Sequence, residues 1–196
     1  HTAYRRQRQM CIRDRLYAIA PQLPELLRKQ LLTILDLVTG AGLSSAEIRR
    51  LRGTDVKPLS VDDLHTAVAI SIRKKGAISR VVPIVCPVRG QRILDRAREA
   101  GDSYVFPCFG DKMPRNAVCH VSEELVERGF RGFNTAALRN RWVAELATHP
   151  GVPAAMLLAM TGIADLRVLH DIQEALPDYR PADFARTLYN LSGELS

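Results

Sequence analysis

"GAGLSSAEIRRLRGTDV", residues 40–56, predicts a glycine-rich turn followed by a short helix. Ser44 or Ser45 is expected to cap this helix, because a serine hydroxyl accepts a hydrogen bond from a free N–H of the first turn. Glu47 then lies in the first turn, where the helix dipole favours a carboxylate. Ser44 therefore allows two interpretations: a plain helix cap, or a small residue at a position where a larger charged group would do chemistry.

The residues before this turn predict a long helix that ends at glycine. The stretch "PELLRKQLLTILDLVTGAG", residues 24–42, carries apolar residues at the three- and four-residue spacing of a buried helical face: Leu27, Leu31, Leu32, Leu35 and Val38. Gly40 and Gly42 follow, as is usual where a helix ends. The turn thus joins two helices.

The residues after the turn predict a β-hairpin. The segments "TAVAISIR" (66–73) and "SRVVPIV" (79–85) are rich in β-branched residues, and Gly76 lies between them. Lys75 is expected at the hairpin tip, close to three more cations: Arg73, Lys74 and Arg80. A solvated turn is the favoured interpretation of this segment alone, although a lysine on a narrow ribbon also suits contact with a DNA backbone.

Helices account for most of the remaining chain. They are expected at 88–101 and near 114–129, 135–148, 153–160, 164–175 and 181–192. The sequence therefore predicts one mainly α (α+β) domain, a helical bundle with a small antiparallel β-sheet.

The helix in "FNTAALRNRWVAELA", residues 133–147, carries Arg139 and Arg141 near its start. Arg139 neighbours Leu138 and is expected at the edge of the buried stripe. An arginine in such a place is either a paired structural ion or a bidentate phosphate ligand, and the segment alone does not decide between them.

Composition limits what the charge can mean. The chain has 196 residues and a formal net charge of +7, but residues 5–15, "RRQRQMCIRDR", resemble the in-frame translation of a sequencing-library adapter and contribute +4. Residues 1–15 are therefore predicted to be a non-native tail, and residues 16–196 a domain truncated at its N-terminus, with a net charge of only +3. A nucleic-acid partner must be argued from placed residues rather than from net charge.

No apolar run approaches the roughly 20 residues that span a bilayer, so no membrane contact is expected, and the predicted location is the bacterial-type cytoplasm, in association with the nucleoid. Outside the predicted tail, the cysteines are Cys86, Cys108 and Cys119, an odd number without a CxxC pair, which is typical of a reduced compartment. The spacing of the cysteines matches no usual zinc pattern. No metal and no cofactor are expected.

Taken in order, these segments resemble the catalytic domain of the tyrosine recombinase, or phage integrase, family, from about Pro24 to the end of the chain. Residues 39–56 are similar to the first box of that family, and "KKGAISRVVPI" (74–84) to its β-hairpin with a catalytic lysine, here Lys75. The next segments follow in the family's order: "YVFP" (104–107), "RNAVCHVSEELVERGF" (115–130), "TAALRNRW" (135–142) as the second box and "LLAMTGIADLRVLHDI" (157–172) as the nucleophile segment.

The resemblance implies DNA breakage by a tyrosine, with two arginines and a histidine around the phosphate and a lysine at the leaving oxygen. Only Lys75 and Arg139 match these positions. Ser44 stands at the position of the first-box arginine, and Ala136 at that of the second-box histidine. Ile163 stands at the position of the last-box histidine, and Ile172 at that of the tyrosine. Tyr179 could replace the nucleophile only if a loop carried it to Arg139, and surface packing is its favoured interpretation.

The leading hypothesis is an integrase-like DNA-binding domain of a mobile element that is catalytically degenerate. Its expected DNA contacts are the hairpin and second-box cations: Arg73, Lys74, Lys75, Arg80, Arg139 and Arg141. One alternative is an active, divergent recombinase that uses Lys75, Arg139 and Tyr179. Another is a protein-interaction module without DNA binding, because the resemblance implies that the final helix can dock on a second copy or on a recombinase partner.

Overall fold

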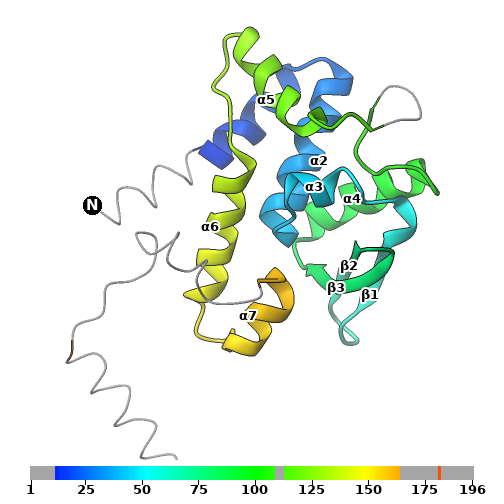
Figure 1. Cartoon of the computed structure of the whole chain (residues 1–196), viewed down its shortest axis with the longest axis vertical. Coiled ribbons are helices and arrows are strands. Elements are labelled where there is room, and N and C mark those ends of the chain that lie inside the picture. Colours follow the sequence, from blue (N-terminus) through cyan, green and yellow to red (C-terminus); the bar gives the residue numbers. More distant parts are fainter. Residues whose placement is uncertain (1–11, 109–112, 164–180, 182–196) are drawn as a thin grey trace, which may run out of the picture.

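The computed structural model describes residues 12–108, 113–163 and 181. Helix α2 runs through the middle of the molecule, with α6 and α7 on one side and α4 and a three-stranded sheet on the other (Figure 1). After a helical segment at residues 12–19, the described elements are η1 (Ala20–Gln22), α2 (Glu25–Ala41), α3 (Ser45–Ile48), η2 (Gly53–Asp55), β1 (Val56–Ser60), β2 (Thr66–Lys74), β3 (Ala77–Ile84), α4 (Pro87–Ala100), α5 (Ala117–Glu127), α6 (Thr135–Ala147) and α7 (Ala154–Thr161). The predicted class, mainly helical with a small antiparallel sheet, is confirmed.

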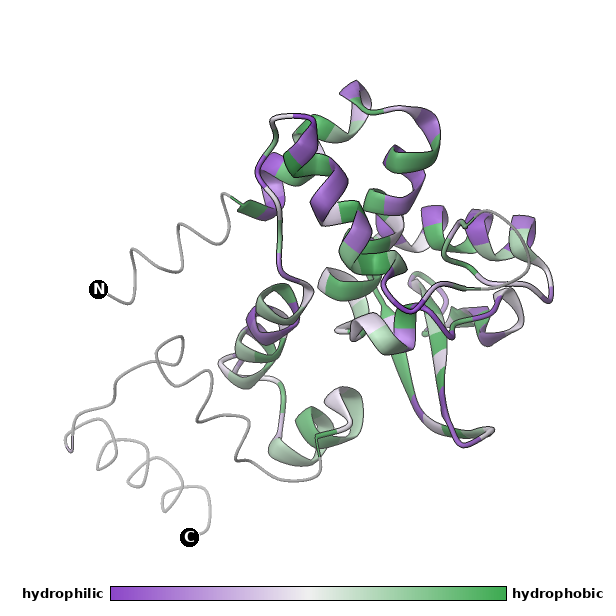
Figure 2. Cartoon of the chain, turned by 45° about the horizontal axis from the view of Figure 1, so that its top comes forward, coloured by the Kyte–Doolittle hydropathy of each residue, from purple (hydrophilic) through white to green (hydrophobic). Residues whose placement is uncertain are grey.

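Helix α2 forms the centre of the hydrophobic core because apolar residues cover most of its circumference. It packs against α4, α5, α6 and β3. Six of its apolar side chains are fully buried: Leu31, Ile34, Leu35, Leu37, Val38 and Ala41. Figure 2 shows hydrophobic residues along this helix and the strands, and hydrophilic residues on the outer sides of the surrounding helices.

The end of α2 is fixed by a glycine that no other residue could replace without movement. Gly42 has φ = 62° and ends the helix in the left-handed conformation. A Cβ atom at this position would lie 2.1 Å from the ring of Trp142 on α6. The close approach of Gly42 to Trp142 therefore sets the distance between the two helices.

The sheet is antiparallel, with strand order β1-β2-β3. Pro58 lies in β1 and Pro83 in β3, the two edge strands, where a residue without an N–H is tolerated. One face of the sheet packs towards α4 and α2 and carries the buried residues Val68, Ile70, Ile72, Val82 and Ile84. The sequence predicted β2 and β3 but not β1, because the short segment 56–60 contains a proline and no alternation of apolar and polar residues.

The remaining boundaries agree with the predicted helices to within about three residues where the chain is described. The predicted helices at 164–175 and 181–192 lie outside the described residues, apart from position 181. Residues 12–15 of the predicted tail are helical, and Ile12 packs against the core. Across the described part of the chain, no helix combines the length and the apolar character that a bilayer crossing requires.

Candidate nucleic-acid interface

Ser44 caps helix α3 through a closed capping box. Its Oγ accepts a hydrogen bond from the Glu47 N–H at 3.4 Å, and its own N–H donates to Glu47 Oε2 at 2.8 Å. The Ser44 hydroxyl also donates to Glu47 Oε2 at 2.9 Å. The position at which the resemblance implies an arginine is therefore occupied by a neutral cap whose polar atoms are bound to Glu47.

Glu47 joins α3 to the hairpin. Its Oε1 accepts a hydrogen bond of 2.7 Å from Nη1 of Arg80 on β3. Burial raises the pKa of Glu47, but hydrogen bonds from Arg80 and Ser44 outweigh it, so that the pKa lies below its ordinary value. Glu47 is therefore ionised at neutral pH and forms a true ion pair with Arg80.

Arg80 is a buried cation inside the site. Its side chain is only 9% exposed, and its Nε donates to the Met160 carbonyl oxygen at 3.0 Å. Nη2 is buried and has no hydrogen-bond partner among the described residues. Strand alternation could have revealed this role, because Arg80 is in phase with the buried Val82 and Ile84 and therefore requires a buried partner.

Arg139 is held by backbone carbonyls from two different segments. Its Nε donates to the Gly42 carbonyl at 2.8 Å and its Nη2 to the Thr161 carbonyl at 2.9 Å. Nη1 has no hydrogen-bond partner in the described part of the chain. Burial lowers the pKa of the half-buried guanidinium, Glu47 raises it and Arg80 lowers it further. One nitrogen of Arg139 thus remains available to an anion.

The two arginines meet at the end of α7. They donate to the carbonyls of Met160 and Thr161, which are consecutive residues. Gly162 follows with φ = 65°, and a Cβ there would lie 2.8 Å from Nη1 of Arg80. The structure therefore brings Ser44, Glu47, Arg80 and Arg139 together, although they come from three different elements: α3 with its cap, β3 and α6.

The other substituted family positions offer no side-chain donor. Ala136 is exposed in the first turn of α6, where Asn134 caps the helix by accepting from the Ala136 N–H at 2.8 Å. Ile163 is half-buried and packs against the core. Ile172 and Tyr179 lie outside the described residues, so the structure places neither of them.

The cations expected to contact DNA differ in their surroundings. Arg73 donates to Asp55 Oδ1 at 2.7 Å and to the Gly76 carbonyl at 3.2 Å. Arg141 donates to Glu145 Oε1 at 2.7 Å and lines a cavity of about 350 Å³ together with Phe133. Because Arg139 and Arg141 are two residues apart on a helix, they point to different sides of it.

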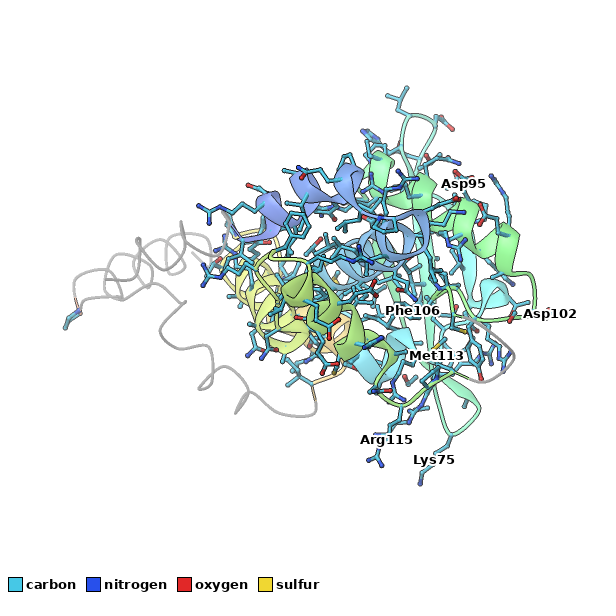
Figure 3. All side chains as sticks on the ribbon, turned by 90° about the horizontal axis from the view of Figure 1, so that it is seen from above. Lys75, Asp95, Asp102, Phe106, Met113 and Arg115 are labelled. Atoms are coloured by element: carbon cyan, nitrogen blue, oxygen red, sulfur yellow. The ribbon has the colours of Figure 1, made fainter. Side chains whose placement is uncertain are left out.

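Lys74 and Lys75 are exposed at the hairpin tip, and neither forms an ion pair within the described ranges. Lys75 has φ = 51° and Gly76 φ = 84°, so both central residues of the two-residue turn are left-handed. Arg115, an exposed residue before α5 that the sequence argument did not select, projects from the same edge of the molecule as Lys75 (Figure 3). The sequence feature that could have drawn attention to Arg115 was its position at the start of the helix predicted near 114–129.

Within the described residues, no group of three or more potential metal ligands comes together. The exposed hairpin lysines and Nη1 of Arg139 are features that could hold an anion.

No family model and no curated protein matches this sequence. Solved structures do match in fold. XerH site-specific recombinase bound to palindromic difH substrate, in a post-cleavage complex, aligns with a TM-score of 0.61 and 16% identity over 91% of this chain and 51% of the XerH chain. XerH in its pre-cleavage complex with difH substrate aligns with a TM-score of 0.60 and 15% identity, over 90% of this chain and 51% of the XerH chain.

The Tn1549 transposon integrase in complex with circular intermediate DNA aligns with a TM-score of 0.55 and 14% identity, over 88% of this chain and 61% of the integrase chain. The present chain thus spans about half the length of the XerH chain that it matches. At these identities the likeness concerns the fold, which is that of the tyrosine recombinase catalytic domain.

Proposed function

We propose that this chain is a DNA-binding domain that keeps the recombinase fold and forms no covalent bond with DNA. The proposal is supported by the fold, which the chain shares with a recombinase and an integrase that were solved with DNA. It treats residues 16–196 as the equivalent of the catalytic domain of those longer proteins.

The observation that carries the proposal is the capping box of Ser44. Transfer of a DNA phosphodiester to a tyrosine needs fixed cations around the phosphate, and removing one such donor typically lowers the rate by about 10²–10³. Ser44 is neutral and its hydroxyl donates to Glu47. Ala136 and Ile163 supply no donor either, so that three of the implied donors are missing together.

The hairpin supports the DNA-binding half of the proposal. A left-handed conformation at a residue other than glycine costs roughly 1–2 kcal/mol, and asparagine or glycine is preferred at this position of a two-residue hairpin turn. Lys75 adopts this conformation with an exposed ammonium. Backbone strain at an exposed lysine favours a binding role for its side chain. The phosphate groups of DNA are a suitable partner for a lysine ammonium.

Two measurements test the proposal. Fluorescence anisotropy with a labelled duplex, at several salt concentrations, should give binding whose salt slope falls by about two in the Lys74→Ala/Lys75→Ala variant, since each phosphate contact contributes about 0.9. Lys29→Ala is the control, because Lys29 lies on α2 and pairs with Glu25 at 2.8 Å. An unchanged slope in the hairpin variant would remove the hairpin as a DNA element.

A suicide substrate that traps covalent recombinase–DNA adducts should give none with this protein. An adduct that disappears in Tyr179→Phe would instead establish the divergent active recombinase. Absence of DNA binding at low salt would leave the protein-interaction module as the explanation.

A further inference from the structure

The cluster at the end of α7 holds three charged groups with a net charge of +1. The guanidinium groups of Arg80 and Arg139 donate to the consecutive carbonyls of Met160 and Thr161, at 3.0 Å and 2.9 Å. The Glu47 carboxylate lies 2.7 Å from Arg80 Nη1. Two cations and one anion therefore occupy a small, partly buried volume in which charges interact more strongly than in water.

The carboxylate cannot turn away from this cluster without breaking further contacts. Glu47 Oε2 accepts from both the backbone N–H and the hydroxyl of Ser44, at 2.8 Å and 2.9 Å. Ser44 thus fixes the anion in place, and because Ser44 is neutral, it adds no cation that would offset the negative charge. With a serine at position 44, Arg80 is the ion-pair partner of Glu47 among the described residues.

The Arg139 guanidinium interacts electrostatically with both Glu47 and Arg80. Glu47 raises the pKa of its guanidinium and Arg80 lowers it, which places all three groups within electrostatic reach of one another. Nη1 of Arg139 is the nitrogen that has no partner among the described residues. An anion that approached this nitrogen would be attracted by two guanidinium groups and repelled by one carboxylate.

We propose that Glu47 is a built-in counter-anion that suppresses phosphate binding at Arg139. This inference rests on the proposed function, because it assumes that Nη1 of Arg139 can bind a phosphate oxygen. The ligand is an oxyanion of the phosphate class, either free inorganic phosphate or a phosphate of the DNA backbone. Neutralising the carboxylate is expected to increase phosphate affinity about tenfold.

A series of variants with known cluster charge tests the proposal. Arg80→Met has a cluster charge of zero, wild type and the double variant Glu47→Gln/Arg80→Met have +1, and Glu47→Gln has +2. Glutamine can still accept the hydrogen bonds of the capping box, so the helix start is kept. Glu124→Gln is the matched control, because Glu124 also pairs with an arginine, Arg128, at 2.9 Å on α5.

The single tryptophan of the chain provides the signal. Trp142 is 6% exposed and lies against Gly42, whose carbonyl accepts from Arg139. Its fluorescence is recorded during titration with potassium phosphate, with potassium chloride at equal ionic strength as the reference. The labelled duplex is titrated in parallel, which separates free phosphate from DNA as the ligand.

The proposal requires phosphate affinity to rise with cluster charge, and the gain in Glu47→Gln to vanish when Arg139→Met is added. Glu47→Gln could fail to fold because Arg80 is left unpaired. In that case the phosphate affinities of Arg80→Met and of the double variant Glu47→Gln/Arg80→Met, which differ only at Glu47, still test the proposal. Equal phosphate affinity in those two variants, or no phosphate binding in any variant, would overturn the proposal. A salt-dependent DNA complex that still depends on Lys74 and Lys75 would then show that the proposed function stands without it.

Discussion

Arg139 of α6 donates from Nε to the carbonyl of Gly42, 97 positions earlier in the chain, at a distance of 2.8 Å. Its Nη2 donates to the carbonyl of Thr161 at 2.9 Å. One side chain therefore joins the end of α2 to the end of α7. This arrangement combines the two interpretations that the sequence left open, because two nitrogens of the guanidinium have structural partners and the third has none among residues 12–108 and 113–163.

Arg139→Lys should test the structural part of this role. Lysine keeps the charge, but its single ammonium lacks the planar fork that reaches both carbonyls. We expect the free energy of unfolding to fall by about 1–3 kcal/mol in urea denaturation, since a buried acceptor loses its partner. Arg128→Lys, in an exposed pair with Glu124, should change it by less than about 0.5 kcal/mol. Equal effects in the two variants would contradict the bridging role.

Gly42→Ala should be strongly destabilising. The added Cβ would lie 2.1 Å from the Trp142 ring, and the φ of 62° is itself unfavourable for alanine. A loss of about 3 kcal/mol is expected from the overlap and the backbone together. Gly129→Ala is the control for the backbone alone, because Gly129 has φ = 81° and no atom within 4 Å of the added Cβ. Similar losses in the two variants would show that the helices move apart freely.

Lys75→Asn should separate stability from DNA binding at the hairpin. Asparagine tolerates the left-handed conformation better than lysine, so the free energy of unfolding should rise by about 0.5–1 kcal/mol. The same change removes an exposed cation and should weaken DNA binding in the anisotropy measurement. Lys74→Asn, at the end of β2, should weaken binding without the gain in stability. A variant of Lys75 that binds DNA as well as wild type would contradict the proposed contact.

Tyr17 should make stability depend on alkaline pH. Its hydroxyl donates to Asp36 Oδ1 at 2.8 Å, and burial, followed by the charge of Asp36, raises the pKa of Tyr17 to about 12. Because the folded-state pKa lies above the ordinary value of 10.0, this contribution is complete below pH 10 and is lost as the pH rises from about 10 to about 12. Unfolding of Tyr17→Phe should therefore show a smaller loss over this range than wild type. If the free energy of unfolding fell equally with pH in wild type and Tyr17→Phe, the proposed contribution of Tyr17 would be excluded.

Restoring catalysis should need several substitutions at once. Ile172→Tyr alone is expected to give no covalent adduct with a suicide substrate, because Ser44 and Ala136 still provide no donor at the phosphate. Only the combination with Ser44→Arg and Ala136→His should form one, since groups that act as a unit lose their effect together. Ser44→Arg also removes the helix cap, at a cost of about 1 kcal/mol, so the fold of each variant is checked by circular dichroism. An adduct from Ile172→Tyr alone would disprove the degeneracy argument.

The sequence by itself determined the order and type of most described elements. Residues 24–42 form a helix because their apolar residues recur at helical spacing, and residues 66–85 a hairpin because β-branched runs flank Gly76. These are local properties of the chain. Of the two serines that the sequence offered as the helix cap, Ser44 is the cap, and its partner Glu47 is likewise local, only three residues away.

Only the tertiary structure decided how the site is built. Arg80 meets Glu47 across 33 residues and Met160 across 80, and no local pattern specifies such partners. Strand β1 likewise depends on pairing with β2, since the segment 56–60 has little strand character of its own. A guanidinium takes its role from the acceptors that the folded chain places around it, and these acceptors come from segments that lie far apart in the sequence.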